Sequence, residues 1–94
     1  MIRVVTVLQT GYASPSQWQG TLDDGRMVYA RYRWGVLSVR VSPSPTTDIT
    51  DAVRGEEIVD VQLGNSLDGA LDYDQLKAAT RDVVTWPEGC DGER

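Results

Sequence analysis

Histidine is absent from this 94-residue chain, and cysteine occurs once, at Cys90. Without histidine, the usual general base for a serine or cysteine nucleophile is missing. A single cysteine cannot form a disulfide within the chain, which excludes a small secreted domain held together by disulfides. We interpret Cys90, which lies beyond Pro87 in an acidic tail, as an unreactive thiol, and we expect that the protein is not an enzyme.

Long apolar runs are also lacking. The run at residues 4–8 is too short for the core of a signal peptide or for a membrane span. Glycine-rich phosphate-binding loops, cysteine clusters and zinc-binding spacings are missing as well. We therefore expect a cytoplasmic protein with no membrane association, no cofactor and no metal.

One stretch resembles a calcium-binding loop at some positions. Residues 64–75 place Asp68 and Gly69 at the fifth and sixth loop positions. However, the first position is Gly64 instead of aspartate, and the twelfth is Gln75 instead of the bidentate glutamate. Because the two strongest ligands are missing, we interpret this stretch as a turn that leads into a capped helix.

Charge is divided unevenly along the chain. Residues 1–47 carry five arginines and two aspartates, a net charge of +3, whereas residues 48–94 carry four cations and twelve carboxylates, a net charge of −8. The two halves together give the net charge of −5. A solvated acidic face is one interpretation, and an acidic patch for a basic partner is the other. The candidate patch consists of Glu56, Glu57, Asp60, Asp68, Asp72 and Asp74.

The clearest β pattern lies at residues 18–41. Asp24-Gly25 separates two runs rich in β-branched and aromatic residues, and this pair tolerates the positive φ angles of a tight hairpin turn. A second turn is expected at Trp34-Gly35, and the run after it alternates in polarity as a half-buried strand does. The pattern predicts a three-stranded antiparallel meander.

Further strands are predicted on either side of the meander. Residues 2–9 are apolar on both faces, which is typical of a central strand covered on each side. Residues 57–63 form another strand, with Val59, Val61 and Leu63 pointing inward.

Two helices are expected in the second half. A short helix is capped by Thr47 or Asp48 and runs through Arg54. The main helix opens at Asp72 with a capping box and is stopped by Pro87. Its buried stripe is predicted to comprise Leu76, Ala79, Thr80 and Val83.

Strands first and helices late are typical of the α+β class. We predict a mostly antiparallel sheet of about five strands with a central meander, one short helix and one longer C-terminal helix packed on a face. A single domain is expected at residues 1–87, followed by a flexible tail at residues 88–94.

Arginines and aromatic residues are interleaved in the meander. Such residues on a sheet can hold single-stranded nucleic acid by stacking on bases and neutralising phosphates. Alternatively, the aromatic residues face the core or pack across strands while the arginines pair with the acidic half. The net negative charge of the chain works against nucleic acid. The candidate partner-binding residues are Arg26, Tyr29, Arg31, Arg33, Trp34 and Arg40.

Three segments carry a resemblance to known sequences: residues 17–41, residues 63–80 and the closing Trp86-Pro87 pair. Together they resemble small uncharacterised proteins encoded by actinobacteriophages and actinobacterial genomes. The resemblance implies an accessory phage product that acts in a host cytoplasm. It implies no catalytic motif and no functional residues.

We therefore expect a small non-enzymatic binding protein, a phage accessory product that binds and modulates a host protein. Its contact would be the arginine and aromatic face or the acidic half. The alternative is a nucleic-acid-binding accessory protein that uses the same arginine and aromatic face. The sequence leaves the oligomeric state open, with dimerisation through an exposed strand edge as one option.

Overall fold

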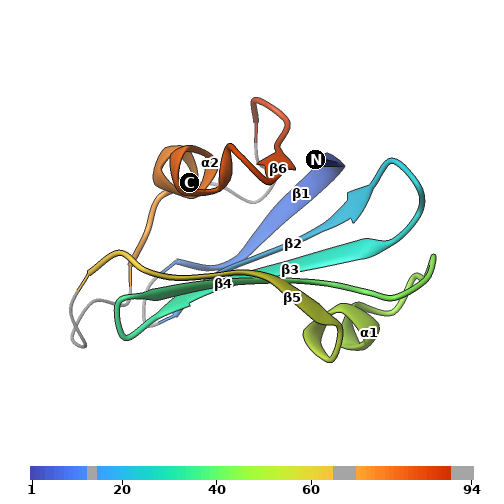
Figure 1. Ribbon diagram of the computed structural model, residues 1–94, viewed down its shortest axis with the longest axis horizontal. Helices are drawn as coiled ribbons and strands as arrows, with labels where there is room; N and C mark the ends of the chain where they lie inside the picture. Colours follow the sequence, from blue (N-terminus) through green and yellow to red (C-terminus); the bar gives the residue numbers. More distant parts are fainter. Residues whose placement is uncertain (13–14, 65–69, 90–94) are drawn as a thin grey trace.

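The computed structural model describes residues 1–12, 15–64 and 70–89. In chain order the elements are β1 (Ile2–Tyr12), β2 (Ser16–Leu22), β3 (Met27–Arg33), β4 (Val36–Val41), α1 (Ile49–Val53), β5 (Glu56–Gln62), α2 (Tyr73–Thr80) and β6 (Val84–Thr85). The strands form one curled sheet in the order β5-β4-β3-β2-β1-β6 (Figure 1). Within the described residues the sheet thus has six strands instead of about five, and it is mixed because β6 pairs parallel to β1.

The predicted meander of β2, β3 and β4 is confirmed, and its two turns have different geometry. The first turn contains Gly25 at a φ of +91°, as the Asp24-Gly25 pair predicts. In the second turn both Trp34 and Gly35 have positive φ angles, of +56° and +78°. Two consecutive positive φ angles are the pattern of a type I′ hairpin, whose twist matches that of the flanking strands.

The core lies on one side of the meander, which we call the inner face. Alternate residues of a strand point to the same side of a sheet, so each strand contributes every second residue. The meander side chains of the inner face, each no more than 2% exposed, are Trp18, Leu22, Val28, Ala30, Tyr32, Leu37, Val39 and Val41. Helix α2 lies over this side and α1 lies on the opposite side, the outer face (Figure 1).

Strand β1 is not covered on both faces, contrary to the prediction. Val4 and Val7 are both buried although they are three residues apart, and Val5 is 44% exposed. A register shift between Val4 and Thr6 explains this, because an extra residue in a strand reverses the alternation beyond it. Gly20 on β2 permits the close approach, since a Cβ atom at that position would collide with the carbonyl oxygen of Thr6.

Helix α2 begins as the capping pattern predicts. The Asp72 side chain accepts a 2.7 Å hydrogen bond from the backbone N–H of Gln75. In return, the Gln75 side chain accepts a 3.0 Å hydrogen bond from the backbone N–H of Asp72. This reciprocal pair satisfies two backbone donors that a helix start would otherwise leave without partners.

The end of α2 differs from the prediction. The helix stops at Thr80, well before Pro87, and the chain turns into β6. Val84 pairs with Ile2 of β1 and is 1% exposed, so this route both buries a valine and satisfies backbone groups at the sheet edge. A helix continued to Pro87 would forgo this pairing, so the prediction of a long helix is wrong beyond Thr80.

The predicted stripe of α2 is buried only in part. Leu76 and Thr80 are buried, whereas Ala79 and Val83 are exposed. Tyr73, which the pattern did not select, is 3% exposed and packs edge-on against Trp86. The buried stripe therefore runs from Tyr73 through Leu76 to Thr80, and Val83 lies outside it because the helix ends at Thr80.

Helix α1 and strand β5 follow the meander, and β5 adds an edge strand to the sheet beside β4. The Asp48 side chain caps α1 by accepting a 3.0 Å hydrogen bond from the backbone N–H of Thr50, as one of the two predicted caps. Strand β5 is an edge strand, and Val61 and Leu63, which were expected to point inward to the core, are 36% and 45% exposed. An edge strand has a neighbour on one side only, so its apolar residues are less covered than those of β4.

Several predictions concern residues outside the described ranges. These are Asp68 of the candidate acidic patch, Cys90, and most of the tail predicted at residues 88–94. Among the described residues, none of the helices has both the length and the apolar character that crossing a membrane requires.

Candidate partner-binding surface

The outer face of β3 and β4 carries most of the predicted partner-binding residues. Burial of Ala30 and Tyr32 on the inner face leaves Tyr29, Arg31 and Arg33 on the outer face. Strand β4 places Arg40 directly across from Tyr29 in the sheet register. The alternation in the sequence and the pairing of the strands therefore bring four of the six candidates to one face.

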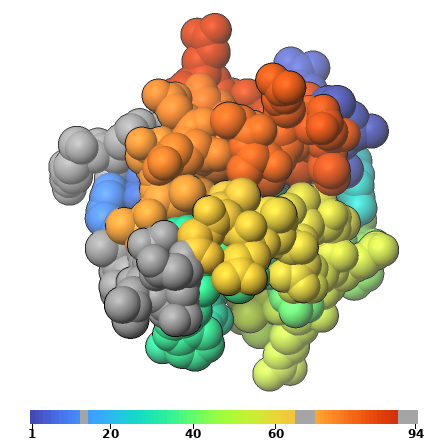
Figure 2. Space-filling view, turned by 60° about the vertical axis from the view of Figure 1, so that its left-hand side comes forward, coloured from blue at the N-terminus to red at the C-terminus, as the bar shows by residue number. Residues whose placement is uncertain are grey.

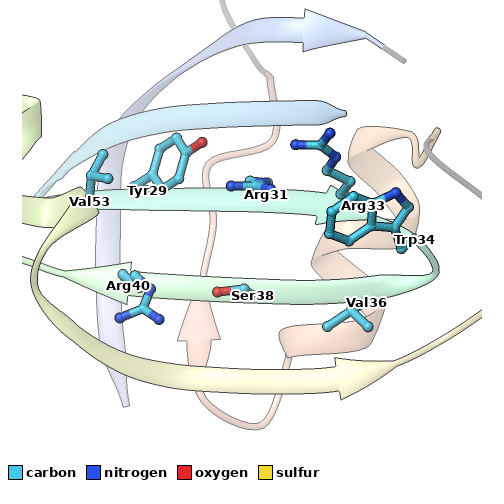
Figure 3. Close-up of a pocket in the computed structure, with 8 residues that line it drawn as sticks. All are labelled: Tyr29, Arg31, Arg33, Trp34, Val36, Ser38, Arg40 and Val53. Atoms are coloured by element: carbon cyan, nitrogen blue, oxygen red, sulfur yellow. The ribbon is translucent and has the colours of Figure 1, made fainter. Parts of the chain in front are cut away.

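These side chains line a shallow hollow of about 330 Å³ (Figure 3). The outer faces of the neighbouring strands β3 and β4 form its floor, with Val53 of α1 at one end and Trp34 of the β3–β4 turn at the other. We call this the arginine–tryptophan surface, and it consists of Tyr29, Arg31, Arg33, Trp34, Val36, Ser38, Arg40 and Val53.

Trp34 stands out in this surface because its backbone is unfavourable for a large side chain. Its φ of +56° is a left-handed conformation that glycine and asparagine adopt with less strain. The side chain is nevertheless 60% exposed, so it contributes little to the core. The guanidinium carbon of Arg33 lies 4.2 Å from the centroid of the indole ring, within the range of a cation–π contact.

The arginines of the surface differ in their partners. Arg40 forms an ion pair with Glu57 on β5 at 3.1 Å and donates a 3.2 Å hydrogen bond to the carbonyl of Gly55. Within the described ranges, neither Arg31 nor Arg33 forms an ion pair. One prediction was that the arginines pair with acidic residues of the second half. Among the described residues of this surface, Arg40 forms such a pair.

Tyr29 and Ser38 are held in place by neighbouring strands. The Tyr29 hydroxyl accepts a 3.0 Å hydrogen bond from the side-chain amide of Gln17 on β2. The Ser38 hydroxyl donates a 2.9 Å hydrogen bond to the same Glu57 carboxylate that pairs with Arg40. These contacts fix the floor of the hollow, whereas Trp34 and Arg33 stand exposed at its rim.

Arg26 does not belong to this surface. It lies at the β2–β3 turn, where its guanidinium forms an ion pair of 2.7 Å with Asp24. The backbone N–H of Arg26 also donates a 3.0 Å hydrogen bond to the Asp24 carboxylate, and this contact lowers the pKa of Asp24 below its ordinary value. Arg26 therefore has a local partner within its own hairpin turn.

The candidate acidic residues occupy two different elements. Glu56, Glu57 and Asp60 lie on the edge strand β5. Asp72 caps α2, and Asp74 in the first turn of the helix lies 3.4 Å from the ammonium group of Lys77. Both elements reach the surface in Figure 2, where β5 is yellow and α2 is orange. Three of the five described carboxylates thus already serve in an ion pair or a cap.

Some residues of the surface were not among the sequence candidates. Val36 and Ser38 alternate with the residues that β4 buries, so their position on the face of Arg40 follows from the strand pattern. No sequence pattern predicts the position of Val53 in this surface. It depends on how α1 packs against the outer face, which is set by the path of the chain after β4.

Over the described ranges, no group of three or more metal-ligating side chains lies close enough to hold an ion. Comparison of the chain with protein-family models, with curated proteins and with solved structures gives no match. The site must therefore be interpreted from its own chemistry.

Proposed function

We propose that this chain is a small non-enzymatic protein that binds another protein through the arginine–tryptophan surface. The observation that carries the proposal is Trp34, a large side chain that is 60% exposed on strained backbone and lies against the guanidinium group of Arg33. Tryptophan, tyrosine and arginine are the residue types most enriched at the energetic centres of protein interfaces. Backbone strain that contributes nothing to the core is characteristic of sites kept for binding.

The nature of the partner follows from the sequence resemblance. An accessory phage product in an actinobacterial cytoplasm would meet host proteins, and binding to one of them would modulate its activity. The absence of histidine from the chain supports a role in binding rather than in catalysis.

Single-stranded nucleic acid is the second candidate. It is favoured by the outward row of Tyr29, Arg31 and Arg33, because rings that stack on bases beside guanidinium groups that contact phosphates form such sites. The capture experiment described next tests both candidates.

The experiment is capture from an actinobacterial lysate by the immobilised protein, with and without nuclease. We expect a protein to be captured in both conditions, and we expect capture to fall in the Arg31→Ser, Arg33→Ser double variant and in Trp34→Gly. The Arg3→Ser, Arg81→Ser double variant is the control, because it removes two exposed arginines from other elements with the same change in net charge.

Nuclease treatment distinguishes the two candidates, and the variants test the surface. Loss of capture after nuclease treatment would support nucleic acid. Equal capture by the surface variants and the control variant would refute the arginine–tryptophan surface as the contact.

A further inference from the structure

We infer that the arginine–tryptophan surface binds an extended acidic segment of the partner protein, with carboxylates at two alternate positions of that segment. This inference rests on the proposed function and specifies the chemistry of its partner. Within the described residues, three features of the outer face support it: the number of arginines without an ion pair, their spacing and the residues around them.

The number of available cations on this face is small. The ion pair with Glu57 already neutralises Arg40. Within the residues that the structure describes, Arg31 and Arg33 remain as guanidinium groups of this face without an ion pair. Two guanidinium groups match two carboxylates, and the planar fork of arginine pairs well with a carboxylate.

The spacing of these two arginines selects the shape of the ligand. Arg31 and Arg33 occupy alternate positions of β3, so their Cα atoms are about 6.6 Å apart along the strand. A partner segment in extended conformation repeats its side chains on one face at the same interval. In a helix, residues two apart do not lie on the same face, so a segment with carboxylates at alternate positions engages both arginines only when it is extended. A helical ligand would instead carry its carboxylates three or four positions apart.

The ends of the hollow also fit a short peptide. Trp34 provides apolar surface beyond Arg33, Val36 provides it across from Arg33 on β4, and Val53 provides it beyond Tyr29 (Figure 3). An apolar residue on either side of the two acidic residues would therefore have a surface to contact. A binding site with charged residues in the middle and apolar residues at each end favours a segment of about five residues over a simple counterion.

The surroundings argue against a long polyanion. Strand β5 lies beside β4 and carries Glu56, Glu57 and Asp60 along the sheet edge. In the register, Asp60 lies across from Ser38 of the surface itself. A nucleic acid gains affinity from each neutralised phosphate. Within the described residues, the two arginines of this face that lack an ion pair allow few such contacts, and the net charge of the protein is −5.

The test uses three capped octapeptides of identical composition in a threonine- and valine-rich background. They carry two aspartates at positions i and i+2, i and i+1, or i and i+4. Binding is measured by fluorescence anisotropy at low and at moderate salt, and a twelve-nucleotide oligo(dT) strand is measured in parallel. We expect the i, i+2 peptide to bind about tenfold more tightly than its two isomers, because only this spacing engages both arginines at once.

Variants connect the peptide to the surface. The Arg31→Ser, Arg33→Ser double variant should lose the preference for the i, i+2 spacing, and the Arg3→Ser, Arg81→Ser double variant should keep it. Trp34→Gly should weaken all three peptides by a similar factor, because the ring does not distinguish the spacing of the carboxylates.

Equal affinity for the three spacings would overturn the inference, and so would tighter binding of oligo(dT) than of the i, i+2 peptide. If lysate capture still depended on Arg31, Arg33 and Trp34 in either case, the proposed protein-binding function would stand and only its acidic ligand would be refuted. If capture were independent of these residues as well, both would fall.

Discussion

The indole N–H of Trp86 donates a 2.7 Å hydrogen bond to the side-chain hydroxyl of Thr80. The same hydroxyl donates a 2.8 Å hydrogen bond to the carbonyl of Leu76, so a buried chain of three residues joins the end of α2 to the segment after β6. Thr80 is 1% exposed and Trp86 is 8% exposed. Because both side chains are shielded from solvent, water cannot readily replace either partner in this hydrogen bond.

Thr80→Val is expected to destabilise the protein by about 1–3 kcal/mol, because a nearly isosteric side chain would leave the buried indole N–H without an acceptor. Thr80→Ser is the control, since it keeps the hydroxyl and loses one methyl group, at about 0.8 kcal/mol. Urea denaturation measures both values. Equal losses in the two variants would mean that the hydrogen bond contributes nothing to stability.

Leu76→Asp is expected to abolish cooperative unfolding. Leu76 is fully buried, so the substitution removes about 1.5–3 kcal/mol of burial and adds an unpaired buried charge. Ala79→Asp on the same helix should fold, because Ala79 is exposed. Thermal melting followed by circular dichroism distinguishes the two, and a cooperative melt of Leu76→Asp would contradict the packing of α2.

Gly20→Ala is expected to destabilise the fold by about 1–3 kcal/mol, because the added methyl group would collide with the backbone of Thr6. Gly89→Ala is the matched control, since a Cβ atom there meets no atom of the described residues within 4 Å beyond its own chain neighbours. Its effect should stay within about 0.5 kcal/mol. If denaturation midpoints of the two variants coincide, the close approach of β1 and β2 does not limit stability.

Trp34→Asn is expected to leave stability unchanged or to raise it by as much as about 1.5 kcal/mol. Relief of a left-handed conformation contributes about 1–2 kcal/mol, and loss of the cation–π contact with Arg33 removes about 0.5–1 kcal/mol. Trp34→Val should instead destabilise, because a β-branched residue is strained at positive φ. A large loss of stability in Trp34→Asn, measured by urea denaturation, would show that Trp34 serves the fold rather than binding.

Asp24 should make stability depend on pH in the acidic range. Its pKa is lowered in the folded protein, first by the hydrogen bond from the backbone N–H of Arg26, so the folded state binds this proton less readily than the unfolded state. Its contribution is therefore present above the ordinary pKa of 3.8 and is lost as the pH falls through the lower folded value.

The variant that tests this dependence is Asp24→Asn. The difference in Tm between the wild type and Asp24→Asn should be largest near neutral pH and should shrink below pH 3.8. Asp23→Asn is the control, because it removes the neighbouring carboxylate and leaves the contacts with Arg26 intact. A Tm difference that stays constant down to the acid limit would contradict the lowered pKa of Asp24.

The local pattern of the sequence predicted the meander, both of its turns and the caps of both helices. Each of these depends on residues that are neighbours in the chain, such as Asp24 and Gly25 in a turn or Asp72 and Gln75 in a capping box. The same alternation placed Tyr29, Arg31 and Arg33 on one face of β3.

Other features depend on contacts between distant parts of the chain. The pairing of β6 with β1 ended α2 at Thr80, and it joins residues more than eighty positions apart. The register shift in β1 required Gly20 of the next strand, and the ion pair between Arg40 and Glu57 required β5 to lie beside β4. The local sequence around each strand does not indicate which distant strand will pair with it.

The sequence by itself thus determined which side chains share a strand face and where the chain turns, because φ preferences and alternation act over a few residues. Only the tertiary structure decided which arginines on the outer face have an ion-pair partner within the described chain. That outcome depends on which strands become neighbours, and the choice of neighbours reflects burial summed over the whole sheet.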